Sequence, residues 1–106
     1  MAPEPAQVIE DVEPHGRRLL RIRGELDMAS RENVEPAITV AARSGASVIL
    51  DLSELSFCDS SGISMLFAVH KKAVAAGGAL TIRAPLPAVR RVIEITRLDS
   101  VIPVTG

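Results

Sequence analysis

Residues 47–63, SVILDLSELSFCDSSGI, contain the clearest structural pattern in the sequence. The apolar run over residues 48–50 is typical of a strand that is buried on both faces, and such strands lie in the middle of a sheet. Residues 51–59 then predict a loop, and a helix is expected from Ser60 to the glycine pair at 77–78. This order predicts that the loop after a central strand leads directly into the first turn of a helix.

The predicted helix has two distinct faces. Five large side chains share one face at helical spacing, and we expect them to pack on the sheet: Ile63, Leu66, Phe67, His70 and Val74. If they do, the exposed side beside Ser60 is lined by Ser61, Ser64, Met65, Ala68 and Lys72. This strip is a candidate partner surface; the alternative is an ordinary solvated helix face.

The segments before residue 47 predict a hairpin and a helix. Strand patterns at residues 8–12 and 17–24 are separated by a turn, which indicates an antiparallel pair. Ser30 is a favourable N-cap for a helix that would bury Val34, Ile38, Ala41 and Ala42. Pro36 lies beyond the first turn of that helix, so we expect the helix to be kinked or to start late.

The segments after residue 78 complete an alternating pattern. Residues 80–83 predict a strand, Pro87 is suited to the first turn of a further helix, and residues 101–104 predict a last short strand or a packed tail. Residues 1–7 are expected to form a loose tail. The whole pattern predicts an α/β fold, a mixed sheet of roughly four or five strands with about three helices packed on it.

Composition limits the class of protein. The chain has 106 residues, of which 47% are hydrophobic and 24% charged, and this predicts one domain over residues 1–106. A net charge of -1, with two Phe and no Trp or Tyr, argues against direct binding of nucleic acid. A single cysteine, Cys58, and the lack of a secretory or membrane-spanning pattern predict a cytoplasmic protein that does not contact the membrane directly. Cys58 itself is expected to be a small buried residue.

Residues 59–62, Asp-Ser-Ser-Gly, are the most informative polar segment. Ligands of α/β proteins bind where the carboxyl ends of strands meet the starts of helices, and the free N–H groups of a helix start favour an anion. A phosphate on Ser60 would be such an anion. The simpler interpretation is that Asp59 or Ser60 only caps the helix.

Several segments in a fixed order resemble one family. The segments are Gly24 to Asp27, Asp51 to Gly62, the pair Gly77 and Gly78, and the residues Pro87, Val89 and Arg91 at the start of the last long helix. Together they resemble the STAS domains, and within these the anti-sigma factor antagonists of bacteria. Two positions depart from the family pattern, because Ile63 and Ser64 stand where the family usually has Leu and Gly. Ser64 adds bulk where a partner would approach, and this puts the identity of the partner in doubt.

The resemblance implies a phosphorylation switch at Ser60. In this family the partner is both an anti-sigma factor and an ATP-dependent serine kinase, and the unmodified antagonist captures it and frees a sigma factor. Phosphorylation releases the partner, and a serine phosphatase resets the switch. Phosphoserine adds about -1.5 to -2 charges at pH 7, which supports release, because a buried contact would have to desolvate that charge. The resemblance implies no cofactor and no catalysis, and we expect the free domain to be a monomer.

The residues expected to bind the partner combine the two lines of reasoning. The resemblance adds Asp27, whose alternative role is only to end a strand. The full set is Asp27, Asp59, Ser61, Gly62, Ser64, Met65, Ala68 and Lys72.

Two other functions compete with the switch. A hydrolase needs its nucleophile and base in contact, but Ser60 and His70 on one helix would be about 15 Å apart. No phosphate loop and no cluster of metal ligands occurs in the sequence, so we expect no metal site. The stronger alternative is an adaptor domain with the same fold, whose partner binding would not depend on the state of Ser60.

Overall fold

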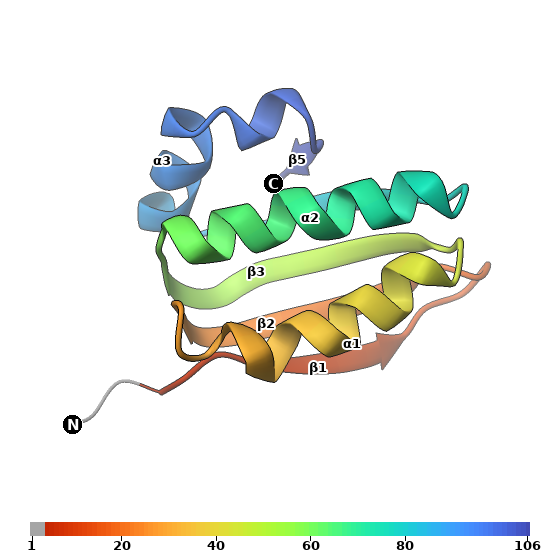
Figure 1. Cartoon of the computed structure of the whole chain (residues 1–106), viewed down its shortest axis with the longest axis horizontal. Coiled ribbons are helices and arrows are strands. Elements are labelled where there is room, and N and C mark those ends of the chain that lie inside the picture. Colours follow the sequence, from red (N-terminus) through yellow and green to blue (C-terminus); the bar gives the residue numbers. More distant parts are fainter. Residues whose placement is uncertain (1–3) are drawn as a thin grey trace.

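The computed structural model describes residues 4–106, which form one sheet with helices packed on it (Figure 1). The strands of the described chain are β1 (Gln7–Val12), β2 (Arg18–Leu26), β3 (Ser47–Cys58), β4 (Ala79–Arg83) and β5 (Val104–Thr105). The helices are α1 (Arg31–Arg43), α2 (Ser60–Ala75), α3 (Pro87–Ile95) and the short 3-10 helix η1 (Leu98–Ser100). The predicted α/β fold with a mixed sheet is confirmed.

The order of the strands places the helices on one side. The spatial order is β1-β2-β3-β4-β5; β1 pairs antiparallel with β2, and all later pairs are parallel. Crossovers between parallel strands are right-handed, so successive crossovers that advance in one direction leave their helices on the same face. Figure 1 shows α1 and α2 side by side over that face. The connections from strand to helix therefore all lie at one edge, which we call the carboxyl edge.

The two faces of the sheet differ in chemistry. The helix-covered face holds the core, with Leu20, Leu50 and Ile82 fully buried beneath the helices. On the opposite face Arg83 Nη2 lies 3.0 Å from the Asp51 carboxylate. The alternation of side chains along the strands explains this division, because neighbouring residues point to opposite faces. The expected buried face of α1 is also confirmed: Val34, Ile38, Ala41 and Ala42.

The central strand is longer than predicted. Residues 51–58 were expected to be a loop, but they continue β3 as far as Cys58. The prediction is wrong because β2 also extends past residue 24, so that Glu25 pairs with Phe57 and Leu26 with Cys58. The backbone groups of residues 51–58 thereby gain hydrogen-bond partners in β2, which the local sequence does not reveal. Two irregularities in the register of this pair adjust it along its length.

Of the two effects expected from Pro36, a kink or a late start of the helix, the structure excludes the late start. α1 begins at Arg31, five positions before Pro36, so the helix does not start late. Pro36 is exposed, which leaves water free to bond the carbonyl that would have accepted its missing N–H.

The tail predicted over residues 1–7 is not loose from Glu4 onward. The N–H of Glu25 bonds to the carbonyl of Glu4 at 2.9 Å, the N–H of Ala6 bonds to the carbonyl of Glu25 at 2.9 Å, and Ala6 is buried. Residues 1–3 lie outside the described chain.

Later elements agree with the sequence. α3 starts at Pro87, and residues 104–105 form a short fifth strand beside β4. Across residues 4–106, no helix combines the length and the apolar character that crossing a membrane requires.

Candidate functional site

Ser60 is the first residue of α2 and lies exposed at the carboxyl edge. Asp59 precedes it in extended conformation, and its Oδ1 accepts a hydrogen bond from the N–H of Gly62 at 3.0 Å. Asp59 also donates its own N–H to the carbonyl of Leu26 at 3.1 Å, which ties the start of α2 to the end of β2. Asp59 is therefore the cap, as one of the two interpretations expected. The hydroxyl of Ser60 is left free of that role.

Gly62 allows α2 to sit close to the strand ends. It is buried, and a Cβ there would lie 2.6 Å from Cys58 Sγ and 2.9 Å from the Leu26 side chain, well inside van der Waals contact. Cys58 is buried as predicted, and burial, with a smaller contribution from Asp59, raises the pKa of its thiol to about 12. A thiol in this state is protonated and fills space. Gly62 and Cys58 thus position Ser60 through packing.

A hydrogen-bonded turn joins β2 to α1 at the same edge. The Ser30 hydroxyl donates to the carbonyl of Glu25 at 2.8 Å, and Asp27 Oδ1 accepts from the N–H of Ser30 at 2.9 Å. Ser30 occupies the N-cap position of α1, as predicted, but its hydroxyl makes no cap hydrogen bond to the first turn of the helix. Its hydroxyl instead holds the turn together and is buried. Hydrogen bonds from the backbone and hydroxyl of Ser30 lower the pKa of Asp27, which keeps that carboxylate ionised.

An arginine links the starts of the first two helices. Arg31 Nη1 lies 3.4 Å from the carbonyl oxygen of Ser61, and its Nε is 2.7 Å from the Glu35 carboxylate. Sequence analysis missed this contact, since only the parallel packing of α1 beside α2 brings Arg31 to Ser61. Arg31 and Glu35 are four residues apart, a spacing that allows an ion pair along one face of a helix, so the sequence could have indicated this ion pair but not the contact with Ser61. The contact adds positive charge near the first turn of α2.

The predicted exposed strip on α2 is correct only in part. Ser64 is exposed, and Ser61, Ala68 and Lys72 are half-buried, but Met65 is 0% exposed. The expectation of an exposed Met65 is wrong because α2 is covered by the sheet below and by α1 at its side. The stripe of Met65, Val69 and Ala73 at four-residue spacing is the pattern that would have indicated this wider buried face.

Part of the face expected to pack on the sheet is also more open than predicted. Ile63 and Leu66 are buried, whereas Phe67 and His70 are half-buried. Val74, in the last turn of α2, is 56% exposed.

The structure brings the first residues of the predicted partner set together and separates the others. The bond between Asp59 and Leu26 places Asp59, Ser61 and Gly62 next to the turn that carries Asp27. Ser64, Ala68 and Lys72 follow along α2, away from the edge. The group at the carboxyl edge is therefore the compact candidate site, with Ser60 at its exposed tip.

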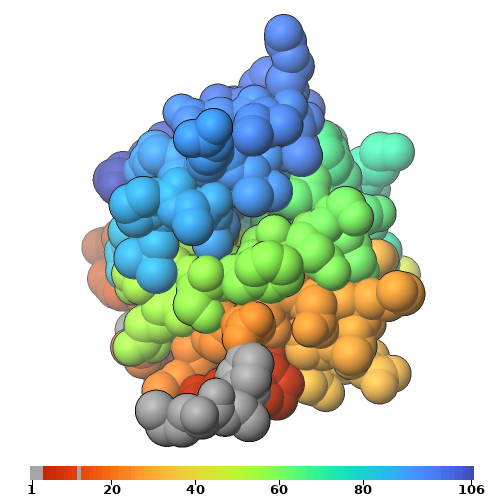
Figure 2. All heavy atoms as spheres, turned by 90° about the vertical axis from the view of Figure 1, so that its left-hand side faces the viewer, coloured from red at the N-terminus to blue at the C-terminus, as the bar shows by residue number. Residues whose placement is uncertain are grey.

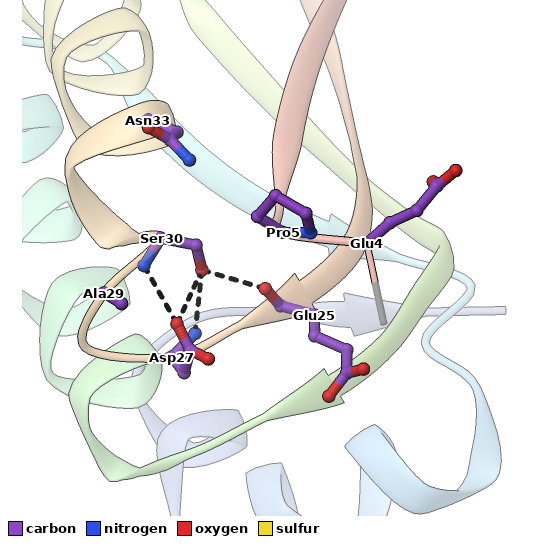
Figure 3. A pocket seen from close by; sticks show the side chains of 7 residues that line it. All are labelled: Glu4, Pro5, Glu25, Asp27, Ala29, Ser30 and Asn33. Atoms are coloured by element: carbon purple, nitrogen blue, oxygen red, sulfur yellow. Dashed lines mark hydrogen bonds between the residues drawn. The ribbon is translucent and has the colours of Figure 1, made fainter. Parts of the chain in front are cut away.

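A pocket of about 210 Å³ lies beside this group, between residues 4–5 and the turn before α1. Figure 3 shows Asp27 and Ser30 joined by hydrogen bonds on one side of it, with Glu4 and Pro5 on the other. Carboxylates of Glu4, Glu25 and Asp27 give it negative character. In the part of the chain that the structure describes, no group of three or more His, Cys, Asp or Glu is arranged to hold a metal ion.

Known proteins resemble the chain in both sequence and structure. It is 30% identical over 82 residues to the anti-sigma F factor antagonist of Lysinibacillus sphaericus, covering 76% of this chain and 70% of that protein. It is 27% identical to the antagonist of the same name from Paenibacillus polymyxa, over 89% of this chain and 83% of that protein. A stretch of 74 residues is 31% identical to T-complex protein 1 subunit delta of Debaryomyces hansenii, but it spans only 13% of that protein.

Solved structures extend the likeness to the fold. A crystal structure of an anti-sigma factor antagonist from Mycobacterium paratuberculosis superposes with a TM-score of 0.86 at 29% identity, over 99% of this chain and 89% of that one. Unphosphorylated SpoIIAA, an anti-sigma factor antagonist, has the same fold with a TM-score of 0.76 at 24% identity, over 93% of this chain and 88% of that one. The family model for the STAS domain matches residues 6–105. On this evidence, the chain belongs to the STAS domain family.

Proposed function

We propose that this chain is an anti-sigma factor antagonist that is switched by phosphorylation of Ser60. The observation that carries the proposal is the exposed Ser60 hydroxyl at the first position of α2, beside an Asp59 that already caps the helix. Sequence relatives named anti-sigma factor antagonists support the same function. In this proposal the chain binds a protein partner in the cytoplasm as a monomer and is a substrate, with no catalysis of its own.

The proposed partner is an anti-sigma factor that is also an ATP-dependent serine kinase. The Ser60 oxygen attacks the γ-phosphorus of ATP, a new O–P bond forms, and the bond from that phosphorus to the β-γ bridging oxygen breaks. The hydroxyl proton passes to a base of the kinase, and ADP leaves. A serine phosphatase returns Ser60 to the hydroxyl form by hydrolysis.

Electrostatics gives the switch its direction. Before transfer, Ser60 is neutral and can approach the nucleotide phosphates in the kinase. Afterwards it carries about -1.5 to -2 charges that face the anionic ADP and lie beside the side chain of Asp59. Like charges at such a contact repel, and the phosphoserine is better solvated on the free antagonist, at the positive end of α2. The fold remains, because an exposed first-turn residue has room for the added group.

The test uses the purified chain, a purified anti-sigma factor of the serine kinase class from the same organism, and ATP. We expect intact-mass spectrometry to detect one phosphate on the unmodified chain and on Ser64→Ala, and none on Ser60→Ala. Ser64 is the matched control, because it is exposed one turn along the same helix. Binding to the anti-sigma factor is expected to persist in Ser60→Ala and to fall by at least about 100-fold in Ser60→Asp.

The outcomes separate the switch from the adaptor function. Equal binding by the unmodified chain, Ser60→Ala and Ser60→Asp would leave Ser60 with a structural role only and favour the adaptor. Circular dichroism of each variant checks that the fold is intact, and an unfolded Ser60→Asp would also contradict the proposed mechanism.

A further inference from the structure

Two of the three connections from a parallel strand to the next helix carry a large, exposed apolar side chain, and the strand before the other connection carries one next to its last residue. Met28, between β2 and α1, is 78% exposed; Phe57, at the end of β3, is 46% exposed; and Leu86, just before α3, is 38% exposed. Exposed apolar residues are common singly, but their repetition at one edge indicates a contact surface. We call Met28, Phe57 and Leu86 the edge triad.

The edge triad lies near Ser60, with Phe57 on the strand face opposite Cys58. A backbone hydrogen bond joins Leu26 to Asp59. Met28 is two residues after Leu26, and Ser60 directly follows Asp59. Phe57 is three residues before Ser60, in register with Glu25. Both Figure 1 and Figure 2 show the start of α3, which Leu86 precedes, beside the end of β3 and the start of α2. Consecutive Cα atoms are about 3.8 Å apart, which keeps Met28 and Phe57 within a few residue lengths of Ser60.

The geometry of phosphoryl transfer requires the partner to cover this area. A kinase must bring its nucleotide into contact with Ser60, so its footprint is centred there. A typical interface buries about 800 Å² on each partner, equivalent to a disc of about 16 Å radius. A disc of this size around Ser60 extends over neighbouring strand ends, and aromatic and long apolar side chains are the usual anchors of such contacts.

Charge indicates what surrounds the apolar contact. Glu25, Asp27 and Asp59 lie at the same edge, and within the described part of the chain none of them forms a salt bridge. Hydrogen bonding lowers the pKa of Asp27 and so favours its ionised form. Unpaired carboxylates of this kind attract a partner with basic side chains.

We propose that the edge triad anchors the anti-sigma factor around Ser60, through an apolar patch on that partner bordered by basic residues. This inference rests on the proposed function and specifies the surface through which the partner is held. It moves the partner surface from the outer strip of α2 to the strand-to-helix connections. The anchor is independent of the Ser60 hydroxyl, so binding and switching are separable.

The chain offers two matched controls. Val40 and Val74 are exposed apolar residues in the final turns of α1 and α2, at the opposite ends of these helices from the carboxyl edge. Truncation of these residues removes similar apolar area without touching the edge triad. Any general effect of lower surface hydrophobicity would therefore appear in both sets.

The experiment measures the dissociation constant of the purified anti-sigma factor by calorimetry in a Ser60→Ala background, which prevents phosphorylation. We expect Phe57→Ala to weaken binding by at least about 10-fold, and Met28→Ala and Leu86→Ala by about 3- to 10-fold. Val40→Ala and Val74→Ala should each change it by less than about 2-fold. Phe57→Leu replaces Phe57→Ala if the latter does not fold, with a smaller expected loss. Raising the salt concentration should weaken binding to all folded variants, as a basic partner requires.

Two results distinguish this inference from the proposed function. If Ser60→Ala binds, Ser60→Asp does not, and the edge-triad variants bind as tightly as their background, then only the edge triad is overturned. Equal losses in the triad and control sets would overturn it as well. If the unmodified chain neither binds the anti-sigma factor nor receives phosphate from it, both proposals fail.

Discussion

The strand-to-helix connections at the carboxyl edge differ in structure from the helix-to-strand turns at the opposite end of the strands, which we call the amino edge. At the carboxyl edge the connections hold Asp27, Asp59 and Ser60, with hydrogen bonds that leave the Ser60 side chain exposed. At the amino edge, residues 44–46 and 76–78 form short turns of small residues. A Cβ at Gly45 would lie 3.0 Å from the carbonyl oxygen of Ala76, and one at Gly78 would overlap the carbonyl oxygen of Ala46.

The difference shows how a small domain can separate stability from recognition. At Gly45 and Gly78 of the amino edge, backbone packs closely against backbone, and this contact holds the ends of α1 and α2 together. The carboxyl edge presents polar and apolar side chains because its turns are fastened by side-chain hydrogen bonds. Substitutions at the amino edge should therefore lower stability alone, while those at the carboxyl edge should also affect the candidate site.

The largest effect is expected from Gly78→Ala at the amino edge. The new methyl group would overlap the backbone of residues 45–46, which cannot move aside as a flexible side chain can. We expect the free energy of unfolding in urea to fall by about 3 kcal/mol. Gly77→Ala is the control: its Cβ meets open space, and only its positive φ of 82° costs stability, by about 1 kcal/mol. An equal cost for both variants would contradict tight packing at this edge.

A smaller effect is expected from Gly62→Ala at the carboxyl edge, about 2 kcal/mol in the same measurement. Here the overlap is with the side chains of Cys58 and Leu26, which can partly adjust. The double variant Gly62→Ala with Cys58→Ala removes the nearer contact, so its loss should be less than the sum of the two single losses. Strict additivity would show that Cys58 does not limit the approach of α2.

A third comparison uses one serine from each edge. Ser30→Ala leaves the carbonyl of Glu25 and the N–H of Asp27 without the bonds they make to its hydroxyl, and Ser30 is buried. We expect a loss of about 1.5 kcal/mol in thermal or urea unfolding. Ser44 is exposed, and Ser44→Ala removes a part-buried bond to the carbonyl of Ala41 and an exposed bond from the N–H of Ala46, both of which water can replace, so it should cost less than about 0.5 kcal/mol. A larger loss in Ser44→Ala would reverse the proposed difference between the edges.

The smallest effect on stability is expected from Asp51→Asn, a substitution in β3 between the two edges. Burial raises the pKa of this carboxyl, but hydrogen bonds from Ser53 and the Arg83 guanidinium outweigh it and leave the pKa below its usual range. A carboxyl whose pKa is lowered by folding stabilises the fold at pH values above its ordinary pKa of about 3.9. This contribution is lost as the pH falls through the pKa of the folded state. The free energy of unfolding of Asp51→Asn should therefore change less with pH below about 4 than that of the unmodified chain, with a difference of less than about 1 kcal/mol. An identical pH profile for both proteins would show that the ion pair with Arg83 contributes nothing.

Local sequence was enough to predict features that depend on neighbouring residues. The start of α3 at Pro87 and the burial of Cys58 were both expected. Asp59 was one of two residues expected to cap α2, and the structure selects it. A cap bonds to an N–H three residues away, and the fixed φ of proline suits the first turn of a helix, so a short window contains the necessary information.

Three other features required contacts between distant segments. The extension of β3 to Cys58 depends on the added length of β2, the burial of Met65 depends on α1, and the contact of Arg31 with Ser61 joins residues 30 positions apart. The extension of β3 and the contact of Arg31 with Ser61 are not encoded by periodicity in one element, and the burial of Met65 is indicated only by the four-residue spacing of apolar residues along α2. The sequence by itself therefore determined the order of strands and helices and the position of the candidate serine. Only the tertiary structure decided which residues stand exposed around that serine, because burial depends on what packs against each side chain.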